Sequence, residues 1–258
     1  MDCAKAIRYF SKTCIPLWCI PTTAGTGSEV TSFAVLTDAA RGIKHPLVND
    51  DLLPEYAVLD PALLAGVPPS VTADTGMDVL THAAEAYVSS GANTVTDALA
   101  EKAFVLAYQN LLPAYRTPGA CPAKEAMMNA SCLAGMAFNA AGLGISHSLA
   151  HALGGMYHVP HGRLNAMLLP RVISYNAAES RAAEKYARLA RLCGLTASPR
   201  ALSAALGRLL GTLNMPRSLK VDDPAAIAQA ALADVCTAAN PRTPSAQQLA
   251  AIVRELAV

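Results

Sequence analysis

The sequence predicts a mainly α-helical protein, with a bundle-like helical domain over residues 68–258 and a shorter, strand-containing segment over residues 1–67. Hydrophobic residues make up 53% of the 258 residues and charged residues 15%, and aromatic residues are sparse. Such a composition, with its abundant alanine, favours closely packed helices that meet through small side chains. The length suits one large domain or two small ones, and composition does not choose between them.

The segment over residues 1–67 has the sequence pattern of brief strands. Short apolar runs are separated there by Gly, Pro and Asp, which is typical of strands joined by turns. The runs cover Ile15–Pro21, Phe33–Thr37, Leu47–Asn49 and Ala57–Leu59. They are too few to form an independent sheet.

The later part of the chain carries helix start and stop signals. Residues 180–194 are expected to form one helix, opened by Ser180 and closed by Gly194. Asp223-Pro224 and Thr243-Pro244 each place a capping side chain before a proline, so each pair predicts the first turn of a helix.

Residues 126–162 contain no Asp, Glu, Lys or Arg, and this stretch is longer than a membrane-spanning helix requires. Four histidines lie inside it, together with Asn129, Ser131 and Asn139. Polar groups at this density are costly in lipid. They suit a helix-turn-helix buried in protein around a metal or a substrate, which is the structure we expect.

Charge and cysteine content indicate a cytoplasmic protein without a nucleic-acid or membrane partner. The net charge of +1 leaves no basic field that would attract phosphate backbones or anionic lipids. The seven cysteines are an odd number without CxxC spacing, so free thiols in a reducing cytoplasm are expected. The start of the chain carries an acid, and Pro16 interrupts its apolar run, which argues against a cleaved signal peptide.

Several side chains have the spacing of metal ligands. Asp78 and His82 are four residues apart, as are His147 and His151, so on helices the members of each pair share a face. His161 lies between a proline and a glycine, a rigid turn that could return a further imidazole towards the others. A carboxylate combined with imidazoles suits Fe(II), Zn(II) or a similar divalent ion.

Each of these pairs, taken alone, is more commonly a surface pair or a satisfied core histidine. Their clustering changes this, because four of the six histidines fall between residues 147 and 161 in the uncharged stretch. Neutral imidazoles buried there would need partners, which a metal would supply. His45 and His158 are expected to be structural or peripheral, and Glu85 and Tyr87 to pack or to form hydrogen bonds.

The segment Thr22–Glu29 (TTAGTGSE) could bind an anion, since its glycines let backbone N–H groups approach closely at the start of a helix or turn. The segment is neither GxGxxG nor a P-loop, and a turn of this composition between two strands is usually only a turn. It gains weight from its position upstream of the candidate metal ligands.

Because these segments occur in this order, the chain resembles the iron-dependent (group III) alcohol dehydrogenase family over nearly its whole length. The matching blocks are Pro21–Glu29, Thr75–Tyr87, His151–Gly154 and Pro160–Gly162. The resemblance implies that Asp78, His82, His147 and His161 bind Fe(II) or Zn(II). It places His151 near the nicotinamide and the substrate rather than among the ligands.

In that family an amino-terminal α/β domain binds NAD(P), and substrate lies between it and a helical metal-binding domain. This sequence departs from the pattern at its beginning, where the family's Gly-Gly-Gly-Ser phosphate loop and first strands are absent. Residues 1–67 are therefore expected to be a small remnant of an α/β dinucleotide-binding domain. The resemblance leaves as cofactor contacts Thr22, Thr23, Thr26, Thr31, Val35 and Lys44.

The implied activity is an NAD(P)-linked oxidoreductase that interconverts a primary alcohol and an aldehyde, with His151 relaying the proton of the alcohol. With only half of the family's pyrophosphate-binding site, several hydrogen bonds to the dinucleotide would be lost. We therefore expect weakened or absent activity. The alternative is a non-enzymatic, metal-binding fragment that self-associates. Unpaired strand edges between residues 15 and 59 predict a homo-oligomer in either case.

Overall fold

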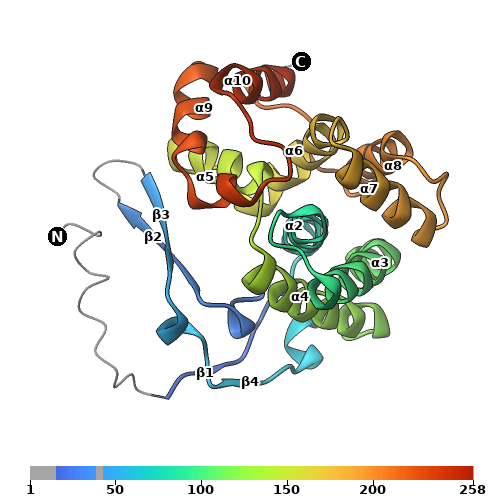
Figure 1. Cartoon of the computed structure of the whole chain (residues 1–258). Helices are drawn as coiled ribbons and strands as arrows, with labels where there is room; N and C mark the ends of the chain where they lie inside the picture. The colour runs from blue at the N-terminus through green and yellow to red at the C-terminus, as the bar shows by residue number, and fades with distance from the viewer. Residues whose placement is uncertain (1–15, 39–42, 258) are drawn as a thin grey trace.

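The computed structural model describes residues 16–38 and 43–257, with helices gathered on one side and a strand-containing segment on the other (Figure 1). The helices are α2 (Pro69–Val88), α3 (Thr94–Arg116), α4 (Pro122–Ala141), α5 (Ile145–Tyr157), α6 (His161–Asn176), α7 (Ser180–Leu192), α8 (Pro199–Thr212), α9 (Pro224–Leu232) and α10 (Ala246–Arg254). Short 3-10 turns η5 (Val235–Ala239) and η6 (Glu255–Ala257) follow α9 and α10. The mainly α fold class is confirmed.

The leading segment holds brief strands, as the apolar runs predict. The strands are β1 (Trp18–Cys19), β2 (Phe33–Asp38), β3 (Ile43–Val48) and β4 (Tyr56–Ala57), with 3-10 turns η2 (Ser28–Val30), η3 (Asp50–Leu52) and η4 (Pro61–Leu64). Among the described residues β1 pairs in parallel with β4, and β2 pairs antiparallel to β3. Residues 58 and 59, expected in a strand, follow β4 instead.

The helix start at Asp223 is confirmed, whereas the one at Thr243 is wrong. The Asp223 side chain accepts hydrogen bonds from two backbone N–H groups of α9. Helix α10 begins at Ala246, and its cap is Ser245, whose hydroxyl and backbone N–H both bond to Gln248. This reciprocal box satisfies two groups, so it sets the helix start two residues later than the proline suggests.

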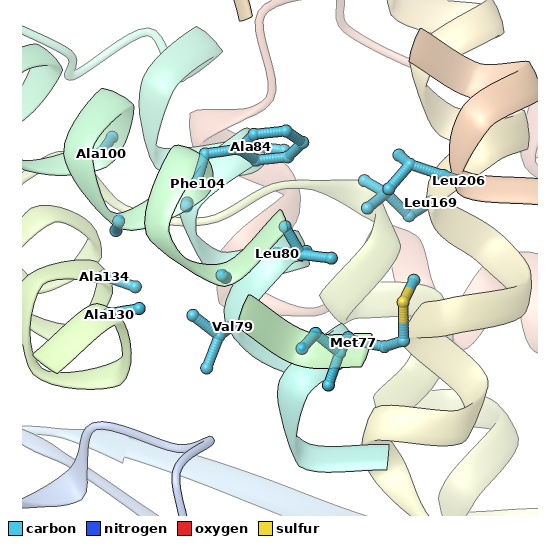
Figure 2. Packing of buried hydrophobic residues seen from close by; sticks show 14 of the residues in the cluster. Met77, Val79, Leu80, Ala84, Ala100, Phe104, Ala130, Ala134, Leu169 and Leu206 are labelled. Atoms are coloured by element: carbon cyan, nitrogen blue, oxygen red, sulfur yellow. The ribbon is translucent and has the colours of Figure 1, made fainter. Parts of the chain in front are cut away.

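Helix α2 runs through the middle of the larger hydrophobic core. It packs against α3, α4 and α6, and every residue from Gly76 to Val88 is buried. Figure 2 shows alanines of the neighbouring helices close to α2 on one side and longer side chains on the other: Ala100, Ala130 and Ala134 against Leu169 and Leu206. Small side chains let the helix axes approach closely.

A second core joins α5, α6, α9 and α10, with Leu149, Leu153, Leu168 and Ile227 fully buried. The uncharged stretch over residues 126–162 covers most of α4, all of α5 and the first two residues of α6, and the α5 histidines His147 and His151 are buried. Within the described part of the chain, no helix combines the length and the apolarity that crossing a membrane would require.

The strand segment is anchored on the helices rather than separated from them. Ala24 and Leu64 belong to the same core cluster as α2, α3 and α4. Helix α2 begins at Pro69, close to the boundary after residue 67 drawn from the sequence. The division into two domains stays a prediction, because this shared core crosses it.

Candidate metal centre

Three of the side chains singled out from the sequence converge. Asp78 lies on α2, His147 on α5 and His161 at the first position of α6, and their ligand atoms all lie within 4.8 Å of one another. We call these three residues the ligand cluster. The Nε2 atoms of both histidines lie 3.7 Å from Asp78 Oδ1. This is too far for a hydrogen bond and is close to the separation of two atoms that each lie about 2.1 Å from one ion.

His82, the fourth ligand implied by the resemblance, lies beside the cluster. Its ring stacks on His147 and on Phe138, with centroids 4.5 Å away in each case. It is not in the group whose ligand atoms all lie within 4.8 Å. Its Nδ1 atom is buried and has no hydrogen-bond partner in the part of the chain that the structure describes.

His147 shows that these residues fit a cation. Its Nδ1 atom lies 2.6 Å from Glu85 Oε2, whereas its buried Nε2 atom has no hydrogen-bond partner among residues 16–38 and 43–257. Burial lowers the pKa of His147 well below its usual value, and His82 and His161 lower it further, so the ring is neutral. A neutral imidazole that donates through Nδ1 has its lone pair on Nε2. An unpartnered buried nitrogen costs about 1–3 kcal/mol, which coordination of a cation would offset.

Glu85 fixes this imidazole. Its carboxylate also accepts the backbone N–H groups of Gly144, at 2.9 Å, and Ser146, at 2.7 Å, where α5 begins. These N–H groups have no partner within the helix. Burial raises the pKa of Glu85 to about 7, against hydrogen bonds from Ser146, Gly144 and His147 that lower it. Glu85 is thus a hydrogen-bonding residue, as expected, and it orients His147.

Asp78 is held as a carboxylate. Burial raises its pKa, but His82, His161 and His147 together with a hydrogen bond from Asn165 bring the pKa of Asp78 below its usual value. The Asn165 amide nitrogen lies 2.8 Å from Asp78 Oδ1 and 3.1 Å from His161 Nε2. Asn165 therefore links two members of the ligand cluster.

The glycine after His161 permits the close approach of α6 to α2. A Cβ atom on Gly162 would lie 2.1 Å from the carbonyl oxygen of Asp74 and 3.3 Å from Asp78 Cβ. A larger residue would push the first turn of α6 away from α2. The Pro-His-Gly sequence thus places His161 against Asp78.

His151 lies one turn beyond His147 on α5, outside the ligand cluster. Its ring stacks on that of His161, with centroids 5.2 Å apart and planes at 16°. Its Nδ1 atom lies 2.8 Å from Asp234 Oδ2. The shared helix spacing of His147 and His151 thus brings both rings to one place, and their partners differ.

A cavity of about 320 Å³ opens over these side chains. Its lining combines hydroxyl groups from the strand segment, apolar side chains, and the imidazole and carboxylate groups: Thr26, Ser28, Thr31, Phe33, Val35, Asp78, His82, Phe138, Leu143, His147, His151, His161 and Cys236. The arrangement can hold a small molecule between a metal site and a hydroxyl-rich wall.

The six residues implied as cofactor contacts divide between different places. Thr26, Thr31 and Val35 line the cavity, whereas Thr22 is exposed, Thr23 is partly exposed, and neither lines it. The side chain of Lys44 lies outside the described residues.

Sequence reasoning missed Asn165, Phe138 and Asp234. Asn165 lies four residues after His161 on the same helix, so helical spacing is a signal that could have found it. Asp234 follows His151 by 83 positions and belongs to none of the motifs quoted above, so only the tertiary structure brings it to His151.

Comparison with known proteins agrees with this geometry. Residues 72–257 match the Fe-containing alcohol dehydrogenase family, C-terminal, and residues 1–61 match the family described as iron-containing alcohol dehydrogenase. The chain is 47% identical over 280 residues to the 1-propanol dehydrogenase PduQ of Citrobacter freundii, covering 99% of this chain and 75% of that protein. The chain therefore belongs to the iron-containing alcohol dehydrogenase family.

Solved structures show the same fold. A 1,3-propanediol oxidoreductase superposes with a TM-score of 0.90 at 41% identity, over 96% of this chain and 67% of that one. A sulfoacetaldehyde reductase from Bifidobacterium kashiwanohense, in complex with NAD+, has a TM-score of 0.87 at 31% identity, over 96% of this chain and 66% of that one. The chain thus spans about two thirds to three quarters of the length of these relatives.

Proposed function

We propose that this protein is a metal-dependent oxidoreductase that interconverts a small primary alcohol and its aldehyde with NAD(P). The observation that carries the proposal is the ligand cluster, with the unpartnered Nε2 atom of His147 beside Asp78 and His161. We include His82 as a fourth ligand, because it lines the same cavity and stacks on His147. The 1-propanol dehydrogenase relative supports a short, uncharged alcohol.

Fe(II) suits the family, and Zn(II) suits the same carboxylate and imidazole donors. When bound, such an ion supplies Lewis acidity that makes an alcohol easier to deprotonate. The residues of this chain supply position: Glu85 and Asn165 orient the ligands, and the apolar side chains of Phe33, Phe138 and Leu143 limit the water around the substrate.

The cofactor wall is proposed from Thr26, Thr31 and Val35, which line the same cavity as the ligand cluster. Thr22, Thr23 and Lys44 remain part of the proposal as contacts farther along the dinucleotide. A nicotinamide ring at this wall would face the carbon of an alcohol in the cavity. The expectation that the 258-residue polypeptide binds the dinucleotide weakly stays a prediction.

Metal analysis and turnover together test the proposal. The 258-residue protein, prepared anaerobically with Fe(II) or with Zn(II), should hold one ion per chain and should reduce propanal with NADH or NADPH. His147→Asn should lose the ion. His158→Asn is the matched control, because His158 is exposed, lies outside the cavity lining and has a φ of 54° that asparagine tolerates. Equal metal content in both variants would contradict the assignment of the ligands.

The second candidate is a metal-binding protein that self-associates without turnover. Exposed apolar side chains on the strand segment favour it: Leu17, Trp18, Ile20 and Tyr56 are 48%, 61%, 54% and 53% exposed. Such a surface is typical of a contact between chains. One bound ion per chain without NADH binding, in a protein that sediments as an oligomer, would support this candidate over the enzyme.

A further inference from the structure

Asp234 holds His151 from a distant part of the chain. It lies between α9 and η5, and its Oδ2 atom is 2.8 Å from His151 Nδ1. The two side chains are 10% and 7% exposed, so little water competes for this contact. A hydrogen bond between a carboxylate and an imidazole in such surroundings fixes the orientation of the ring.

The carboxylate of Asp234 is also held by contacts other than the one to His151. Its Oδ1 atom accepts the backbone N–H of Cys236 at 2.8 Å, which caps η5. The Ser148 hydroxyl, one turn before His151 on α5, lies 3.5 Å from the same oxygen. Although burial raises it, hydrogen bonds from His151 and Cys236 hold the pKa of Asp234 below its usual value. Asp234 is therefore an ionised acceptor.

An ionised acceptor at Nδ1 determines which nitrogen of His151 carries the proton. Nδ1 must donate to Asp234, so in the neutral ring Nε2 carries the lone pair. His151 lines the cavity and stacks on His161, which puts this ring beside the ligand cluster. We propose that Asp234 is a positioning residue that keeps His151 in the Nδ1–H form, so that Nε2 accepts the proton of the alcohol.

This inference rests on the proposed function, and its proton balance is simple. In the oxidation direction, the O–H bond of the alcohol breaks and the proton passes to His151 Nε2. The C–H bond breaks, and its electron pair leaves as hydride to the nicotinamide ring of NAD(P)+, which is reduced. The C=O double bond of the aldehyde forms between the same carbon and oxygen. Asp234 gains and loses no proton in this scheme, and it stabilises the charged ring.

A different use of the same side chains makes a competing prediction. His151, Asp234 and Cys236 offer ligand atoms within 4.8 Å of one another, a spacing that could hold a second cation. In the structure both carboxylate oxygens of Asp234 accept hydrogen bonds, one from His151 Nδ1 and one from the backbone N–H of Cys236. A second tightly bound ion per chain that disappears in Asp234→Asn would overturn the positioning role.

Histidine spectroscopy tests the orientation without turnover. Protein labelled with 15N-histidine and loaded with Zn(II) should show His151 in the Nδ1–H form, with the signal assigned by its loss in His151→Gln. Asp234→Asn should move His151 towards the other tautomer, because one amide oxygen cannot serve both His151 and Cys236. Asp222→Asn is the matched control, since its exposed carboxylate pairs with the exposed Lys220 at 3.7 Å. An unchanged His151 signal in Asp234→Asn would overturn the proposal.

Kinetics then separate positioning from general damage. Asp234→Asn should lower kcat by about 10²-fold, the lower range for a misplaced acid–base group, with KM values and metal content nearly unchanged. In a His151→Gln background the same change should have little further effect, because a residue that acts through another loses its influence when the other is gone. A full additional loss in the double variant would show a structural role instead.

Asp234→Glu keeps the carboxylate and should recover part of kcat, which covers the case in which Asp234→Asn folds poorly. Failure of this rescue, with the His151 signal restored to the Nδ1–H form, would contradict the role in proton transfer. Absence of turnover in the unmodified protein would remove the proposed function. The tautomer measurement would still decide whether Asp234 orients His151, so the two failures are distinguishable.

Discussion

The two walls of the cavity are built differently. On the helical wall the side chains of the ligand cluster are buried or partly buried. Glu85 and Asn165 hold members of this cluster through hydrogen bonds, and Asp234 holds His151 beside it. On the strand wall Thr26 and Val35 are exposed, and the polar contacts of Thr26 are local ones to Ser28. One wall is preorganised for an ion, whereas the other presents hydroxyl groups to whatever lies across it.

This difference indicates where sensitivity to substitution should lie. A buried hydrogen-bonded group is costly to change, because its partner is left unsatisfied in a medium of low dielectric constant. When an exposed hydroxyl is removed, its former partner can form a hydrogen bond to water, so little stability is lost. Substitutions on the helical wall should therefore affect metal binding and stability together, and removal of an exposed hydroxyl on the strand wall should affect dinucleotide binding alone.

The largest effect is expected for Asp78→Asn. The change removes the only carboxylate of the ligand cluster while preserving its shape, so the affinity for Zn(II) should fall more than the ~10–100-fold typical of residues that merely support ligands. Competition with a chromogenic chelator measures this affinity. An unchanged dissociation constant would show that the ion does not contact Asp78.

Glu85→Gln should have the next largest effect. The amide cannot accept from His147, Gly144 and Ser146 as the carboxylate does, so Zn(II) affinity should fall by ~10–100-fold. The free energy of unfolding should also fall by about 1–3 kcal/mol, because a buried N–H loses its acceptor. Chelator competition and thermal unfolding of the metal-free protein report the two effects. A loss of metal affinity without any loss of stability would break the link between them.

Gly27→Ala should disturb the strand wall where it rests on α4. Gly27 has a φ of 63°, and a Cβ atom there would lie 2.8 Å from the Cα atom of Gly135. We expect a loss of more than about 1 kcal/mol of stability and weaker NADH binding, with Zn(II) affinity unchanged. Gly119→Ala is the matched control, because its φ is 74° and none of the described residues lies within 4 Å of its added Cβ. Equal losses in both variants would mean that backbone strain alone is responsible.

The smallest effect is expected for Thr26→Ala. Its hydroxyl is exposed and bonds to Ser28 at 2.8 Å, so stability should change by less than about 0.5 kcal/mol. The loss of one hydrogen bond of about 0.5–1.5 kcal/mol to the dinucleotide corresponds to a roughly two- to tenfold weaker NADH affinity. Thr22→Ala, outside the cavity lining, should weaken NADH binding less than Thr26→Ala does. An effect of Thr22 as large as that of Thr26 would favour the contact set implied by the resemblance over the cavity.

The sequence by itself determined the helical fold and most of the candidate site. Local rules suffice for this, because a cap such as Asp223 acts within one turn, and Asp78 and His82 share a helix face by spacing alone. The uncharged stretch around the histidines predicted burial, and most residues of α4 and α5 are buried. Where two local signals compete, as at Thr243 and Ser245, the pattern alone placed the helix start two residues too early.

Only the tertiary structure decided which partner each imidazole has. His147 and His151 are equivalent by spacing, yet one is bonded to Glu85 from α2 and the other to Asp234 from beyond α9. It also separated Thr26, which lines the cavity, from Thr22, which does not. The physical reason is that helix periodicity fixes the face on which a side chain lies, whereas its hydrogen-bond partner depends on which distant segment packs against that face.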